Sequence, residues 1–563
     1  MMKPPKILSS LKFLIIVCLL GACQDLSDKK STPNAESIRK QFPPPPPPPV
    51  IEEVPEAAIA YRAKSPTLSS AKVQTMKSER PVQKDREQYA PITENQFRSV
   101  IKEPLSTFSI DVDAASYSNL RRFISSGHQP PIDAIRIEEM INYFDYDYPQ
   151  PKGKHPFEVI TEISDCPWNE DHRLVHIGLQ GKKIATDNLP PSNLVFLLDV
   201  SGSMQAQNKL PLLQSSLKLL VNNLRAEDKV AIVAYAGAAG VILPATKGTD
   251  QQKIKAAIDK LQAGGSTAGA EGIQLAYQIA KENFLQEGNN RVILATDGDF
   301  NVGVSSEEAL VKLIEKERKS GVFLTVLGFG QGNYQDYKMQ ELADRGNGNH
   351  AYIDNILEAK KVLVNEFGGT LFTIAKDVKL QIEFNPSKVQ NYRLIGYENR
   401  LLAAEDFNND RKDAGELGAG HTVTALYEII PTGVKSSFAN SVDPLKYQAN
   451  VTPKVVPNAK ELMTIKLRYK QPDGEKSQLM EKPILDQKIA LEKMSDNFRF
   501  SAAVAEFGLL LRDSEFKNKA NYQQVLQLAK SGKGKDKDGY RAELIRLVEM
   551  AELMSEKVVA ERE

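Results

Sequence analysis

The stretch "LVFLLDVSGSM" (Leu194–Met204) decides the fold and raises the question of function. Five apolar residues lead directly into an acid, Asp199, which is followed by Ser201 and Ser203. A strand that is apolar throughout is typical of a parallel sheet that helices cover on both faces. Ligands of such sheets bind beyond the carboxyl ends of the strands, which is where Asp199 lies. The stretch therefore predicts a buried strand that ends at a binding edge.

Further apolar runs follow the first one along the chain. They lie at residues 230–236, 292–296 and 322–330, and amphipathic stretches of helical periodicity separate them. The first of these stretches carries leucines from Leu210 to Leu224 on one helical stripe. Strands that alternate with helices of this length predict an α/β fold with a doubly wound, mostly parallel sheet.

Oxygen-bearing side chains gather at the expected binding edge. Asp199, Ser201 and Ser203 are spaced at i, i+2 and i+4, so a near-extended loop points them the same way. A second strand ends in "LATDGDF" with Asp297, and the glycine-rich loop "GGSTAG" carries Thr267 just before a helix. Two carboxylates and three hydroxyls, completed by water, suit Mg²⁺ or Mn²⁺ better than zinc.

These motifs resemble a von Willebrand factor type A (VWA) domain and its metal ion-dependent adhesion site. "DVSGS" after an apolar strand, a threonine in a glycine-rich loop and "TDG" after another strand carry the resemblance. The resemblance implies that the metal is held, directly or through water, by Asp199, Ser201, Ser203, Thr267 and Asp297. It also implies that one metal position stays open for a carboxylate of a partner protein.

Some assignments in this set have alternatives. Ser266 precedes Thr267, and only the motif alignment selects the threonine. Asp299 is a third acid nearby, which we expect to bond the loop rather than the metal. Asp199 could instead cap a helix N-terminus, but capping does not explain why three separate loops deliver oxygens to one edge.

The resemblance extends into both flanks. "PLSTFSIDVDAASYSNLRRFISSGHQPPIDAIRIEEMINYF" (104–144), "PWNEDHRLVHIGLQGK", "LATDGDFNVG", "NFRFSAAVAEFGLLLRDS" and "GYRAELIRLVEMA" are similar to the bacterial YfbK-type VWA proteins. Strand patterns before and after the middle domain predict a β-sandwich that both flanks build, with the VWA domain inserted. We expect an N-terminal VWA-associated α+β region at 97–191, the VWA domain at 192–370, a β-rich region at 371–490 and a helical region at 491–563.

The N-terminus predicts a lipid anchor. A basic segment precedes the ten-residue apolar run "FLIIVCLLGA", which is about half of a membrane-spanning helix and suits a signal peptide. The run ends in "LGAC", which resembles a bacterial lipobox. This implies a signal peptide at residues 1–23 with the lipid on Cys23. An ordinary cleaved signal that contains a cysteine is the alternative.

A polar segment at residues 24–96 separates this anchor from the folded part. It contains seven consecutive prolines, which form a polyproline II spacer of about 22 Å. The segment lacks apolar periodicity, so we expect a disordered tether. Cys166 is then the one cysteine left in the folded part, without a disulfide partner, and we expect it to be buried or half-buried.

The composition and the absence of catalytic motifs in the sequence limit the possible functions. Lysine plus arginine equals aspartate plus glutamate at 72 each, so net charge gives no reason to expect nucleic acid. The six histidines form no H-E-x-x-H, and there is no G-x-S-x-G or Walker A motif, so we expect no enzyme, a hydrolase being the weakest alternative. We predict an envelope lipoprotein that binds an acidic residue of an unknown protein partner through Mg²⁺, or through Mn²⁺ or Ca²⁺.

Two further expectations concern location and the rival function. Gln24 after the cysteine favours the outer membrane, with the folded part periplasmic or extracellular. The rival function is a structural or assembly factor of the envelope, in which the metal only makes the loops rigid. Binding of a partner that depends on the metal separates the two.

Overall fold

The computed structural model describes residues 87–110, 113–185, 189–265, 269–298, 307–332, 334–366, 372–439, 460–472 and 474–560. The predicted signal peptide, Cys23 and residues 24–86 of the predicted tether lie outside these ranges. Residues 87–96, which were expected in the disordered tether, instead belong to the fold: Glu87 forms an ion pair with Arg122, and Ile92 donates its N–H to Asp133. Within the described ranges, no helix has both the length and the apolar character needed to cross a bilayer.

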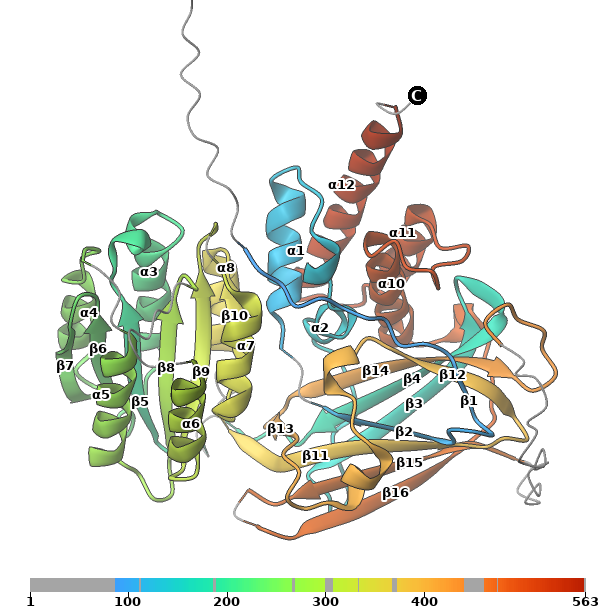
Figure 1. Ribbon diagram of the computed structural model, residues 1–563, viewed down its shortest axis with the longest axis horizontal. Helices are drawn as coiled ribbons and strands as arrows, with labels where there is room; N and C mark the ends of the chain where they lie inside the picture. The colour runs from blue at the N-terminus through green and yellow to red at the C-terminus, as the bar shows by residue number, and fades with distance from the viewer. Residues whose placement is uncertain are drawn as a thin grey trace, which may run out of the picture. The chain divides into compact units, whose positions relative to one another are not determined.

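The predicted α/β sheet is present in the middle of the chain (Figure 1). Its strands run in parallel except for the edge strand β7, which is antiparallel to β6. Every residue of β5 and β8 is buried, which includes the predicted apolar runs at 194–198 and 292–296 and the polar residues before them. In the described chain the sheet order is β10 (His350–Ile353), β9 (Val322–Phe329), β8 (Asn289–Thr296), β5 (Ser192–Asp199), β6 (Lys229–Tyr235) and β7 (Ala239–Lys247).

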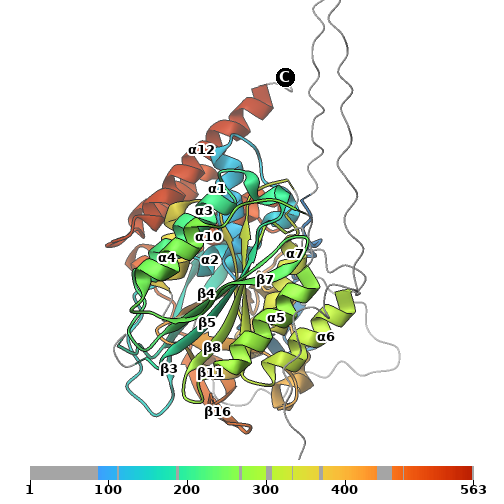
Figure 2. The ribbon, with the colours of Figure 1, turned by 90° about the vertical axis from the view of Figure 1, so that its left-hand side faces the viewer.

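Helices cover both faces of this sheet, which confirms the doubly wound fold. Figure 2 shows α3 and α4 on one side of the strands and α5 and α6 on the other. The leucine stripe predicted from Leu210 to Leu224 is buried against one face. One face packs on α3 (Leu210–Val221), α4 (Gln251–Asp259) and α8 (Ile356–Lys360), and the other on α5 (Gly269–Glu282), α6 (Glu307–Arg318) and α7 (Asp336–Arg345).

The flanks form the predicted β-sandwich together. Strands that precede the VWA domain pair directly with strands that follow it, for example Ile177 opposite Ala425. One sheet has the order β1 (Arg98–Ser99), β12 (Val389–Ile395), β14 (Thr422–Pro431), β4 (Asn169–Gly181) and β3 (Phe157–Cys166). The other has β13 (Gly415–Gly418), β11 (Thr373–Phe384), β15 (Glu461–Lys470) and β16 (Ser477–Leu485), with β2 (Leu105–Ser109) also paired to β11. One continuous apolar core lies between them.

A helical layer covers the outer face of the first sandwich sheet. Leu174 of β4 and Trp168 in the turn before β4 share a core with Phe500 of the C-terminal helices. Cys166 is buried in the same core as a free thiol, as predicted. The helices are α1 (Ala115–Ser125), α2 (Ile137–Asn142), α10 (Asp496–Leu511), α11 (Tyr522–Ser531) and α12 (Tyr540–Ala560). The helical C-terminal region is therefore confirmed.

Candidate metal centre

Asp199 ends β5 at the edge where the parallel strands finish. Its side chain is held by three neighbours: Oδ1 accepts from the backbone N–H of Ser201 at 2.9 Å, and Oδ2 accepts from the hydroxyls of Thr296 at 3.1 Å and Tyr235 at 3.2 Å. These donors come from the loop after β5, from β8 and from β6. The carboxylate is thus fixed in orientation before any ligand binds.

The surroundings of Asp199 disfavour its negative charge. Burial raises the pKa of its carboxyl group, and the negative charge of Asp297 raises it further, while hydrogen bonds from Ser201 act in the opposite direction. Asp199 is fully buried and Asp297 almost so. Two desolvated carboxylates beside each other repel, and a cation bound between them relieves that repulsion.

The hydroxyls of Ser201 and Ser203 converge, but the segment is a 3₁₀ turn and not the near-extended loop that the spacing suggested. Ser201 Oγ lies 3.0 Å from Ser203 Oγ. Ser201 is buried, Ser203 is exposed, and the short turn Gly202–Gln205 is anchored by the buried side chain of Met204. The two hydroxyls therefore lead from the interior toward the surface.

The glycine-rich loop is tied to the loop of Asp199. Gly264 donates its N–H to the carbonyl of Val200 at 2.8 Å, and Gly202 donates to the carbonyl of Gly265 at 3.1 Å. Gly265 has φ +83°, a conformation that favours glycine. Thr267, its neighbour Ser266 and Asp299 lie outside the described residues. The structure thus brings the start of the threonine loop to the centre and leaves the threonine ligand a prediction.

Asp297 follows β8, the strand next to β5, and it has a cationic partner that the sequence did not reveal. The ammonium of Lys209 lies 2.7 Å from Asp297 Oδ2, and the two side chains are 10% and 0% exposed. Lys209 directly precedes α3. A lysine next to a helix start is a common surface feature, so the sequence carried no specific signal for this pair.

The donor set fits a hard divalent cation. Among the described residues, no cluster of three or more His, Cys, Asp or Glu side chains could hold a metal. A centre with two carboxylates therefore depends on hydroxyl and water oxygens, which Mg²⁺ and Mn²⁺ accept and which zinc disfavours. The lysine ammonium at Asp297 already supplies one positive charge to this centre.

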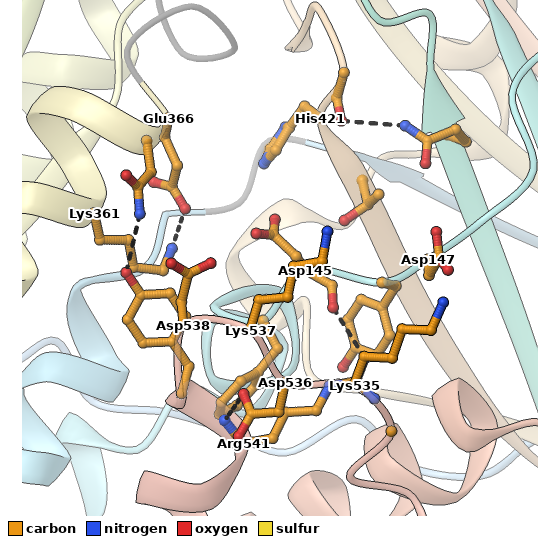
Figure 3. A pocket seen from close by; sticks show the side chains of 18 of the residues that line it. Asp145, Asp147, Lys361, Glu366, His421, Lys535, Asp536, Lys537, Asp538 and Arg541 are labelled. Carbon is orange, nitrogen blue, oxygen red and sulfur yellow. Dashed lines mark hydrogen bonds and ion pairs between the residues drawn. The ribbon is translucent and has the colours of Figure 1, made fainter.

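A separate cavity of about 850 Å³ shares no lining residue with this centre. Figure 3 shows acidic and basic side chains intermixed around it, with Lys361 paired to Glu366. Asp536 accepts hydrogen bonds from the backbone of Arg541 and Ala542, so it caps α12. The lysine-rich loop before α12 is thus a helix-capping turn.

Comparisons with known proteins agree with this architecture. Three family descriptions match: "von Willebrand factor" at 83–176, "von Willebrand factor type A domain" at 194–299 and "Uncharacterized protein YfbK, C-terminal" at 369–554. The uncharacterized protein YfbK of Escherichia coli (strain K12) is 46% identical over 471 residues, which cover 82% of this chain and 81% of that protein. Human inter-alpha-trypsin inhibitor heavy chain H3 is 28% identical over 267 residues, covering 44% and 29%.

Among solved structures, a von Willebrand factor type A protein from Catenulispora acidiphila matches with 17% identity and a TM-score of 0.38. That match covers 70% of this chain and 91% of the other. The E. coli relative and the match to the YfbK C-terminal description show the family. The chain belongs to the YfbK family of proteins that carry a VWA domain.

Proposed function

We propose that this protein is a cell-envelope lipoprotein that binds a protein partner through a divalent cation. The cation is held by Asp199, Ser201, Ser203, Thr267 and Asp297. The observation that carries the proposal is the pair of buried carboxylates at the ends of adjacent strands, with two converging hydroxyls beside them. The VWA domain supports a role in protein interaction, and neither the E. coli relative nor the human one is named as an enzyme.

Each residue has a distinct task in this proposal. Three hydrogen bonds fix the orientation of Asp199, so binding of the cation does not have to order this side chain. Burial of Asp199 and Asp297 excludes water from the inner side of the centre. The exposed Ser203 marks the side that faces a partner. A bound Mg²⁺ supplies an open coordination position, which a partner's aspartate or glutamate completes.

Binding of a partner is tested by capture with the full-length protein. Lysate is passed over immobilised wild type, Asp199→Ala and Asp259→Ala, each with Mg²⁺ and with chelator. Asp259 is an exposed acid on α4 and serves as the matched control. We expect a protein that wild type and Asp259→Ala capture only with Mg²⁺ and that Asp199→Ala never captures. Capture that persists in chelator contradicts the proposal.

The rival structural role gives a different result in the same experiment. If the cation only stiffens the loops, Mg²⁺ raises the melting temperature of the wild type and no protein is captured in its presence. The two functions are therefore separated by one set of samples, because stability and capture are measured on the same preparations.

The lipid anchor is a separate part of the proposal. Labelling cells with a palmitate analogue should mark the wild type and leave Cys23→Ala unmarked, because the lipid bond forms on that sulfur. Fractionation of the membranes then tests the outer membrane as the location. A labelled Cys23→Ala protein, or a soluble wild type, contradicts the anchor and leaves the metal centre untouched.

A further inference from the structure

Lys209 places a positive charge inside the metal centre. Its ammonium lies 2.7 Å from Asp297 Oδ2, and the lysine is 8% exposed. The backbone around it is fixed on both sides: Lys209 donates its N–H to the carbonyl of Ala206, and its own carbonyl accepts from Leu213 in the first turn of α3. The long side chain of Lys209 thus starts from a backbone that is fixed by hydrogen bonds.

A glycine at the end of strand β9 leaves room for the side chain of Lys209. Gly330 follows β9, and a Cβ at that position would lie 2.3 Å from Cε of Lys209 and 2.5 Å from its Cγ. Gly330 has φ +79°, which favours glycine, and its carbonyl accepts a 2.5 Å hydrogen bond from Tyr352. The lysine side chain therefore occupies space that is open only because residue 330 is a glycine.

The pair has an electrostatic consequence for the metal. Asp297 is buried close to Asp199, and a buried carboxylate needs a counter-charge. Lys209 supplies that charge at the oxygen that a cation would also seek. Two cations at one carboxylate repel each other strongly in a partly desolvated site. The ammonium and the divalent ion therefore compete for Asp297.

We infer that Lys209 is an internal competitor that sets the metal affinity of the centre. In the metal-free protein it neutralises Asp297, and a divalent ion binds only when the ammonium leaves that carboxylate. Affinity is then lower than the same oxygens would give alone, so occupancy follows the surrounding metal concentration. This inference rests on the metal-binding part of the proposed function and does not depend on the partner.

The test is a titration of full-length protein with Mn²⁺ alone, without any partner. Lys209→Met removes the charge and keeps the length of the side chain, and Lys209→Gln is the second charge-removing variant if the first does not fold. Lys218→Met is the matched control, because Lys218 lies on α3 and pairs with the exposed Asp259. We expect Lys209→Met to bind Mn²⁺ at least about tenfold more tightly than wild type. Lys218→Met and the charge-retaining Lys209→Arg should bind like wild type.

A second measurement tests the ion pair itself. In chelator, Lys209→Met should melt at a lower temperature than wild type and Lys218→Met, because Asp297 has lost its buried partner. Equal or weaker Mn²⁺ binding by Lys209→Met overturns the inference and leaves the proposed function standing. Tighter Mn²⁺ binding without capture of a protein supports the inference and overturns partner binding. Absence of Mn²⁺ binding in all variants overturns both.

Discussion

Arg121 of α1 donates from Nη2 to Glu358 of α8 over 2.8 Å, and this bond joins a helix of the N-terminal flank to a helix of the VWA domain. The same guanidinium also bonds Asp354 from Nε at 2.8 Å and Glu543 of α12 from Nη1 at 3.0 Å. The side chains of Arg121 and Glu358 are 7% and 1% exposed. One buried cation therefore holds acids from the inserted domain and from the C-terminal helix together.

Loss of this cation should destabilise the protein strongly. Arg121→Met leaves three acids without their shared partner, so we expect a loss of about 3–5 kcal/mol in the free energy of unfolding. Urea denaturation measures it. Arg98→Met removes an exposed pair with Glu103 and should change the free energy of unfolding by less than about 1 kcal/mol. Equal effects of the two variants would show that the Arg121 cluster does not join the parts.

The sequence predicted those features that depend on local pattern. Uninterrupted apolar runs identified β5, β6, β8 and β9, because a strand covered on both faces carries apolar residues on both sides over most of its length. The spacing also predicted that Ser201 and Ser203 would bring their hydroxyls together, but they meet through the 3₁₀ turn Gly202–Gln205 and not through an extended loop. Strand patterns on both flanks indicated a sandwich because neither flank alone could bury its apolar face.

Other features could not be predicted, since they depend on contacts between distant residues or on weak patterns. The edge strand β7 carries the exposed Val241 and Ile242 on one side of Pro244, so it lacks both the buried run and a clear alternation. Lys209 and Asp297 are 88 residues apart, and only the strand order brings them together. Arg121 meets Glu358 across a separation of 237 residues.

Glu506 predicts a dependence of stability on pH. It is fully buried in α10, its Oε1 accepts from Asn521 N–H at 3.3 Å, and burial raises its pKa to about 8. The unfolded chain releases this proton near the ordinary glutamate pKa of 4.5, so between that pH and about 8 the folded state binds more protons. Stability contributed by this group is therefore present at low pH and lost as pH rises through that window.

Glu506→Gln removes this dependence, because the amide stays neutral at every pH. Compared with wild type, the variant should gain melting temperature progressively from pH 5 to pH 8.5. Glu492→Gln, at an exposed position, should follow the wild-type profile. If the melting temperatures of wild type and Glu506→Gln change in parallel across this range, the Glu506 carboxyl is not neutral in the folded protein.

Gly348 is required where the loop between α7 and β10 passes close to β9. A Cβ at this position would lie 1.7 Å from the backbone oxygen of Leu324, which is held in the sheet by the pairing of β9 with β8. Gly348→Ala should therefore abolish soluble expression or lower the melting temperature steeply. Gly153→Ala is the control, because a Cβ there meets nothing within 4 Å. Normal melting of Gly348→Ala would mean that this loop does not approach β9 as described.

Removal of the charge at Asp199 should separate metal binding from folding. Asp199→Asn keeps an oxygen for the N–H of Ser201, and the hydroxyls of Thr296 and Tyr235 can rotate to accept from the amide nitrogen. The substitution also removes the repulsion between Asp199 and Asp297. In chelator, the variant should therefore melt at the same temperature as wild type or higher.

Addition of Mg²⁺ then distinguishes the two proteins. At about 100 times its Kd, an ion that binds only the folded state stabilises it by about 2.7 kcal/mol, so the melting temperature of the wild type should rise by several degrees. Asp199→Asn should show no rise, because one of the two carboxylates that offset the divalent charge is gone. Asp259→Asn, which changes an exposed acid on α4, should keep the full response. An equal rise in Asp199→Asn would place the Mg²⁺ away from this edge of the sheet, and the buried position of Asp199 would then need another explanation.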